Sequence, residues 1–208
     1  MNLNVSDVSD RMVLTADMVI KFLERGNNEY VKNKLFNNFE YETVKEQYPK
    51  AVILSCIDSR IPVKDVFNCD MGDIFVARVA GNIINPDILG SFEYACKISG
   101  SKLIVVLGHN CCGAVKSAID NVELGNITGL LDKLKPAINQ SKIRYKGVTE
   151  SSNPEFVDKV CHTNVKLMIK EIRKLSPVLK EMEDKGEIKI IGAMYDICTG
   201  KVDFFENM

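Results

Sequence analysis

Short apolar runs alternate along the chain with longer segments of helical periodicity. The runs that have the length and composition of strands are 51–55 (AVILS), 73–80, 102–108, 188–197 and 201–205. A continuously apolar run is typical of a strand that is covered on both faces, as in a parallel sheet between helices. The last two runs are joined by the turn sequence CTG, so they predict an antiparallel hairpin.

Apolar positions recur every three or four residues in the segments around these runs. The segments with this helical spacing are 13–36, 84–99, 113–122, 127–141, 153–176 and 177–186. Strands that alternate with helices predict an α/β fold, with a mostly parallel central sheet flanked by helices and an antiparallel C-terminal edge strand. We expect a single domain, in which residues 1–45 form an N-terminal helical arm and residues 46–208 form the catalytic core.

Composition narrows the class of protein. A chain of 208 residues can bury a core of useful size, and its formal net charge of -1 indicates neither a nucleic acid nor a membrane as partner. No apolar run has the length needed to span a bilayer, and the N-terminus lacks a signal-peptide pattern. The chain has an odd number of cysteines, seven, and no need of disulfides at this size. We therefore expect a cytoplasmic protein with mostly reduced thiols.

Three residues of metal-binding types follow two of the predicted strands. Cys56 comes after the run at 51–55, and His109 and Cys112 come after the run at 102–108. Parallel strands bind ligands outside their carboxyl ends, so these side chains could converge on one ion. Two thiolates and an imidazole suit zinc. The fourth position is left to Asp58, to Cys111 or to water.

Asp58 and Arg60 follow Cys56 in the sequence CIDSR. A carboxylate there could orient a zinc-bound hydroxide and accept its proton, and Arg60 could hold that carboxylate away from the metal. The plainer alternative is an exposed ion pair of little energetic value. A redox pair is the rival for the thiols, although adjacent Cys111 and Cys112 do not match the Cys-x-x-Cys spacing.

Five segments resemble the β-class carbonic anhydrases: CIDSR, GDIFVARVAGN, GSFEYA, IVVLGHNCCGAV and GAMYDICTGKV. They lie between about Gln47 and Phe205, in the order of that family. The resemblance implies a lyase with one zinc ion per chain that interconverts carbon dioxide and bicarbonate. It also implies that the ligands of this ion and the catalytic dyad are those named above: Cys56, His109 and Cys112 for zinc, and Asp58 with Arg60 for the dyad.

The resemblance to the plant-type members extends to the substrate pocket. It implies that Gln47, Phe75, Tyr94 and Gly113 bind substrate. Another subgroup closes its zinc with the aspartate and carries a tryptophan three residues before the first cysteine ligand, where this chain has Ile53. We therefore expect an open site with a water ligand.

Other residues have no predicted part in the site. Arg78 matches a family arginine, but without the tryptophan it does not indicate regulation by bicarbonate. His162 is expected on the polar face of its helix. The cysteines without a predicted role are Cys69, Cys96, Cys111, Cys161 and Cys198.

The resemblance further implies a homo-oligomer, either a dimer or a tetramer, with the site in a cleft at the subunit interface and the arms wrapped around the partner. Carbon dioxide or bicarbonate is the expected small-molecule partner. Two alternatives stay open. The same fold could hydrolyse carbon disulfide or carbonyl sulfide, or the chain could be a non-catalytic zinc-binding module.

Overall fold

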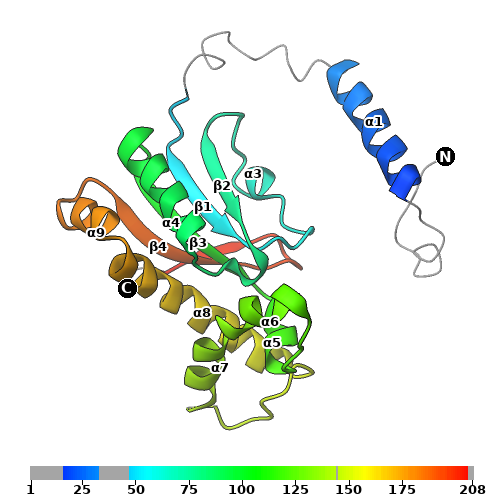
Figure 1. The fold of residues 1–208 in the computed structure, drawn as a ribbon, viewed down its shortest axis with the longest axis vertical. Coiled ribbons are helices and arrows are strands. Elements are labelled where there is room, and N and C mark those ends of the chain that lie inside the picture. Colours follow the sequence, from blue (N-terminus) through cyan, green and yellow to red (C-terminus); the bar gives the residue numbers. More distant parts are fainter. Residues whose placement is uncertain (1–15, 33–46, 144, 206–208) are drawn as a thin grey trace. The chain divides into compact units, whose positions relative to one another are not determined.

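The computed structural model describes residues 16–32, 47–143 and 145–205 (Figure 1). The chain divides into two compact units, Met1–Glu46 and Gln47–Met208. The described part of the first unit is the helix α1 (Ala16–Lys32), which lies within the predicted helix 13–36; the two ends of that prediction fall outside the described residues. Apolar side chains of α1 are exposed, namely Ile20, Phe22, Leu23 and Val31.

The second unit is built on a sheet with the strand order β2-β1-β3-β4-β5. The strands are β1 (Ala51–Ser55), β2 (Ile74–Arg78), β3 (Leu103–His109), β4 (Lys189–Tyr195) and β5 (Val202–Phe204). β1 pairs in parallel with β2 and β3, β3 pairs in parallel with β4, and β5 is antiparallel to β4. The predicted fold class, a mostly parallel sheet with an antiparallel C-terminal edge, is confirmed.

Helices connect the four parallel strands of this unit, and a turn joins β4 to β5 (Figure 1). Their bounds are α3 (Val63–Val66), α4 (Pro86–Glu93), α5 (Gly113–Ile119), α6 (Gly125–Asp132), α7 (Lys135–Lys142), α8 (Pro154–Leu175) and α9 (Pro177–Asp184). A 3₁₀ turn, η3 (Ala80–Asn82), follows β2, and a π-helical turn, η4 (Tyr94–Ile98), continues α4. None of the described helices combines the length and apolar character that crossing a membrane requires.

Two predicted elements differ from the structure in a way that has a clear physical cause. The strand expected at 73–80 ends at Arg78, because the chain turns at η3, where Gly81 has a φ of 70°. The helix expected at 127–141 is two helices, α6 and α7, with Pro136 in the first turn of the second. Proline has no N–H to donate and disfavours a helical residue before it, so a helix restarts there more readily than it continues.

The central strands and the long helix α8 form the core. Leu54 of β1 and Leu107 of β3 are fully buried, and α8 packs against β3 and β4. The register pairs Ser55 with Leu107, so β1 and β3 end at the same edge of the sheet. This register places Cys56, which follows β1, beside the end of β3 at His109.

Candidate metal centre

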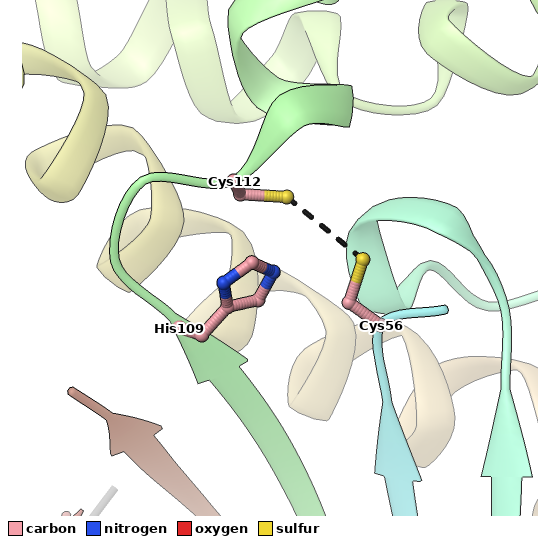
Figure 2. A group of neighbouring side chains, drawn as sticks. All are labelled: Cys56, His109 and Cys112. Carbon is pink, nitrogen blue, oxygen red and sulfur yellow. Dashed lines mark hydrogen bonds between the residues drawn. The ribbon is translucent and has the colours of Figure 1, made fainter. Parts of the chain in front are cut away.

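Cys56, His109 and Cys112 converge at the carboxyl edge of the sheet (Figure 2). Their ligand atoms all lie within 4.8 Å of one another, and the two sulfurs are 4.0 Å apart. Cys56 follows β1, His109 is the last residue of β3, and Cys112 precedes the first residue of α5. The structure therefore brings the three predicted ligands together, as two thiols and one imidazole.

The imidazole of His109 has a nitrogen free for a metal. Its Nδ1 lies 2.8 Å from the backbone oxygen of Asn110, which can only accept a hydrogen bond, so Nδ1 carries the proton. Nε2 then has an unprotonated lone pair. This atom is buried and has no hydrogen-bond partner in the described part of the chain. A buried nitrogen without a partner is costly, and coordination to a metal would satisfy it.

The two thiols also fit a cation. The neighbouring Cys112 thiol, together with burial, raises the pKa of Cys56 to about 12. The Cys161 thiol, with burial adding to its effect, raises the pKa of Cys112 to about 11. Both sulfurs therefore hold their protons at neutral pH unless a positive charge is present to stabilise two thiolates. A zinc ion supplies that charge, so the residues fit the metal that the sequence predicts.

Arg60 holds Asp58 through a two-pronged ion pair. Arg60 Nε donates to Asp58 Oδ1 at 2.9 Å and Nη2 donates to Oδ2 at 2.6 Å, while the backbone N–H of Arg60 adds a bond of 3.0 Å to Oδ1. These bonds lower the pKa of Asp58 to about 2, so its carboxylate is ionised at neutral pH. The Asp58 side chain is 13% exposed and the Arg60 side chain 52%, so the carboxylate is the more buried partner of the pair.

Neither protein candidate for the fourth metal position belongs to the group. Among the described residues, the cluster of possible ligands comprises Cys56, His109 and Cys112 without Asp58 or Cys111. Asp58 is bound to Arg60, and Cys111 is exposed. Cys111 has a φ of 56°, an uncommon conformation for a residue other than glycine. Three protein ligands leave a fourth position to be filled, and the open site with a water ligand stays a prediction.

Besides Cys161, two further neighbours of the site were given no role by the sequence. Arg78 donates from Nε to the backbone oxygen of Cys56 at 2.9 Å and from Nη2 to that of Asp58 at 2.6 Å. Gly81 donates its backbone N–H to Cys56 Sγ at 3.3 Å. Both lie in the motif GDIFVARVAGN, which was used only for the resemblance. The signal available in the sequence was an arginine near the end of a predicted strand and a glycine shortly after it. The structure places this strand, β2, beside β1.

Three of the predicted substrate residues lie away from this group within the chain. The rings of Phe75 and Tyr94 pack edge to face, with 6.4 Å between their centroids. Both residues line a pocket of about 680 Å³, and Cys56, His109 and Cys112 are not among its lining residues. Phe75 pairs with Val52, four residues before Cys56, which is roughly 13 Å along a strand. Gln47 is exposed and precedes β1. The substrate-binding role of these residues stays a prediction.

Gly113, the fourth predicted substrate residue, does lie beside the group. It follows Cys112 and is the first residue of α5, where a backbone N–H has no partner within the helix. Gly113 is exposed, and a side chain there would meet no atom within 4 Å. Its N–H is therefore available to an oxygen of a bound molecule.

Comparisons with known proteins agree with this geometry. Residues 51–202 match the model of the family described as "Carbonic anhydrase". Carbonic anhydrase 2 of Mycobacterium tuberculosis is 32% identical over 160 residues, which cover 74% of this chain and 73% of that protein. The carbonic anhydrase of Mycolicibacterium smegmatis is 33% identical over 167 residues, covering 78% of this chain and 77% of the other.

Solved structures share the fold. A tetrameric β-carbonic anhydrase from Sordaria macrospora superposes with a TM-score of 0.81 at 25% identity, covering 91% of this chain and 98% of that one. The β-carbonic anhydrase of Coccomyxa in complex with acetazolamide has a TM-score of 0.76 at 24% identity, with 92% of this chain and 87% of that one covered.

Proposed function

The chain belongs to the β-class carbonic anhydrases, and from this membership we propose that it catalyses the reversible hydration of carbon dioxide to bicarbonate and a proton. One observation carries the proposal: a buried group of two thiols and an imidazole lies beside a carboxylate that is already bound to an arginine. A structural zinc site normally has four protein ligands, whereas this group offers three.

Cys56, His109 and Cys112 would hold the zinc ion. When bound, zinc lowers the pKa of a water molecule and so supplies a nucleophile near neutral pH. Burial of the three side chains keeps bulk water from competing for the metal. The bond from His109 Nδ1 to Asn110 fixes the orientation of the ring, so that Nε2 keeps its lone pair directed at the metal position.

Asp58 would orient the nucleophile. With a pKa of about 2, its carboxylate can only accept hydrogen bonds at neutral pH. Arg60 donates two hydrogen bonds to Oδ1 and one to Oδ2, which leaves acceptor capacity on Oδ2 for the water that attacks carbon dioxide. The N–H of Gly113 is placed to donate to an oxygen of the bicarbonate that forms.

The catalytic unit that we propose is a homo-oligomer, at least a dimer, in which the pocket of one subunit faces the metal centre of its partner. Support comes from the separation of Phe75 and Tyr94 from the metal group within one chain. The edge strand β2 and the adjacent η4 also expose apolar side chains, with Val76 41%, Tyr94 52% and Ile98 72% exposed. An exposed apolar edge is the kind of surface that a second copy covers.

The test combines zinc content with carbon dioxide hydration on one purified sample, from pH 6.5 to 9. We expect about one zinc ion per chain and activity that rises with pH. Cys56→Ser and His109→Ala should lose zinc and activity together, whereas Cys198→Ser, which removes an exposed thiol, should keep both. The ratio of activity to bound zinc then distinguishes loss of metal from loss of catalysis.

Zinc without hydration anywhere in this range would contradict the proposal. The same sample would then be assayed with carbon disulfide and carbonyl sulfide, and inactivity on all three gases would indicate a non-catalytic zinc module. Activity confined to pH values above about 8 would show that Asp58 closes the metal at neutral pH, contrary to the open site predicted above.

A further inference from the structure

Asn164 is a polar residue in the buried stripe of α8. It is only 1% exposed, and the neighbouring positions of the stripe are the apolar residues Val160, Val165 and Met168. Burying an amide costs free energy unless hydrogen bonds replace those that it made to water. An apolar side chain could be buried in this stripe without that free-energy cost. Packing alone therefore does not explain why the residue is an asparagine.

The amide of Asn164 is directed at Gly81. Its Nδ2 donates to the backbone oxygen of Gly81 at 2.8 Å, while its Oδ1 is buried without a partner among the described residues. In the described part of the chain, the hydrogen bond to Gly81 is therefore the polar contact through which the Asn164 side chain can influence its surroundings. It joins residues 83 positions apart in the sequence, on the long helix and on the turn after β2.

Gly81 in turn contacts the metal centre. Its N–H donates to Cys56 Sγ at 3.3 Å, and its φ is 70°. A side chain at this position would bring a Cβ to 3.1 Å from Leu134 Cδ1, and Leu134 is fully buried. Gly81 is thus held on both sides: its N–H binds the sulfur of a proposed ligand, and its carbonyl binds Asn164.

We propose that Asn164 is a positioning residue for the metal centre, which holds Gly81 so that its N–H stays directed at the sulfur of Cys56. An N–H directed at a thiolate stabilises its negative charge in a site that excludes water. The inference rests on the proposed function only in that Cys56 binds a metal. It does not depend on which substrate is turned over.

The experiment measures zinc affinity by competition with a chelator, using the full chain and the variants Asn164→Ala and Asn164→Ser. We expect both variants to bind zinc about 10-fold more weakly, the lower end of the effect of losing a direct hydrogen-bond partner of a metal ligand, because Asn164 acts through Gly81. The cobalt(II)-substituted protein gives a second readout. Its sulfur-to-cobalt charge-transfer band should shift in both variants, because one thiolate has lost a well-placed donor.

Ser141→Ala is the matched control. Ser141 is also buried, and its hydroxyl donates to Thr163 Oγ1, on the same helix as Asn164, at 2.8 Å. This variant loses a buried hydrogen bond of α8 but keeps the hydrogen bond between Asn164 and Gly81. It should lower the free energy of unfolding but leave the zinc affinity and the cobalt band unchanged.

Wild-type zinc affinity and an unshifted cobalt band in Asn164→Ala or Asn164→Ser would overturn the proposal. So would an equal loss of affinity in Ser141→Ala, because the effect would then be one of general stability. If Asn164→Ala does not fold, Asn164→Ser decides the question with the same two readouts. A chain that fails to hydrate carbon dioxide yet shows the loss of zinc affinity would contradict the proposed function and keep this inference.

Discussion

Arg78 donates from Nε to the backbone carbonyl of Cys56, at 2.9 Å. Its Nη2 reaches the backbone carbonyl of Asp58 at 2.6 Å, so one guanidinium ties the loop after β1 to the end of β2 at two points. The sulfur and the carboxylate that the proposed mechanism needs are carried by these two residues. Their relative placement therefore depends on an arginine that binds the backbone of both residues.

Replacing Arg78 should impair the site without removing any of its chemistry. Lysine cannot span two carbonyls with a planar fork, so we expect both Arg78→Lys and Arg78→Ala to lower kcat/KM for carbon dioxide by roughly 10- to 100-fold. Arg173→Lys is the control, because Arg173 forms a comparable fork with Glu183 on α9. Wild-type kinetics in Arg78→Lys would show that the loop holds its position without these bonds.

Asp58→Asn should separate metal binding from turnover. Asparagine keeps the shape but loses the charge and can present an N–H donor where the carboxylate oxygen accepted a hydrogen bond, so we expect wild-type zinc content with turnover slowed by roughly 100-fold or more. The control is Asp184→Asn, which breaks an ion pair with Lys180 on α9. Normal turnover by Asp58→Asn would mean that the carboxylate only supports the loop.

Gly81 and Gly100 allow backbone strain to be separated from crowding. Both have positive φ, 70° and 81°, but an added Cβ meets Leu134 only at Gly81. Gly100→Ala should therefore cost about 1–2 kcal/mol of unfolding free energy, from the backbone alone. Gly81→Ala should cost more and should also weaken zinc binding. Urea unfolding and zinc titration measure the two effects. An equal loss of unfolding free energy at both positions would show that the Leu134 side chain moves aside without cost.

Cys96 should make the free energy of unfolding depend on pH in the alkaline range. Burial raises the pKa of this thiol from 9.0 to about 11, and the side chain is 3% exposed. The unfolded chain loses this proton first, so the stabilisation is complete below pH 9 and is lost as pH rises through 11. The unfolding free energy of wild type relative to Cys96→Ala should fall by roughly 2 kcal/mol across that window. Cys198→Ala, which removes an exposed thiol, serves as the control; a constant difference would show that Cys96 ionises alike in both states.

Mixed oligomers test the proposed interface. Cys56→Ser inactivates the metal centre, and Gln47→Ala removes a predicted substrate-binding residue of the other subunit. If a site takes its metal from one subunit and its pocket from the partner, each hybrid dimer of these variants contains one intact site, and activity should appear on mixing. A mixture of Cys56→Ser with His109→Ala should stay inactive, because both defects then lie in the metal centre. Verified hybrids of the first pair that remain inactive would contradict the shared site.

Much of the fold could be read from local pattern. The strand AVILS was predicted with its observed bounds, Ala51–Ser55, because a run buried on both faces is uniformly apolar. The helix Val63–Val66 was missed, since four residues are too few to show a helical period. The boundary between α6 and α7 was missed because the apolar pattern continues through the break.

The sequence by itself determined the chemistry of the site. Asp58 and Arg60 are two positions apart, and His109 and Cys112 three, so their pairing follows from local geometry that a short motif preserves. Tertiary structure decided what surrounds them. The contacts of Gly81 with Cys56 and of Asn164 with Gly81 span 25 and 83 positions. Such contacts depend on strand register and on how α8 packs on the sheet, and no local pattern of side chains encodes either.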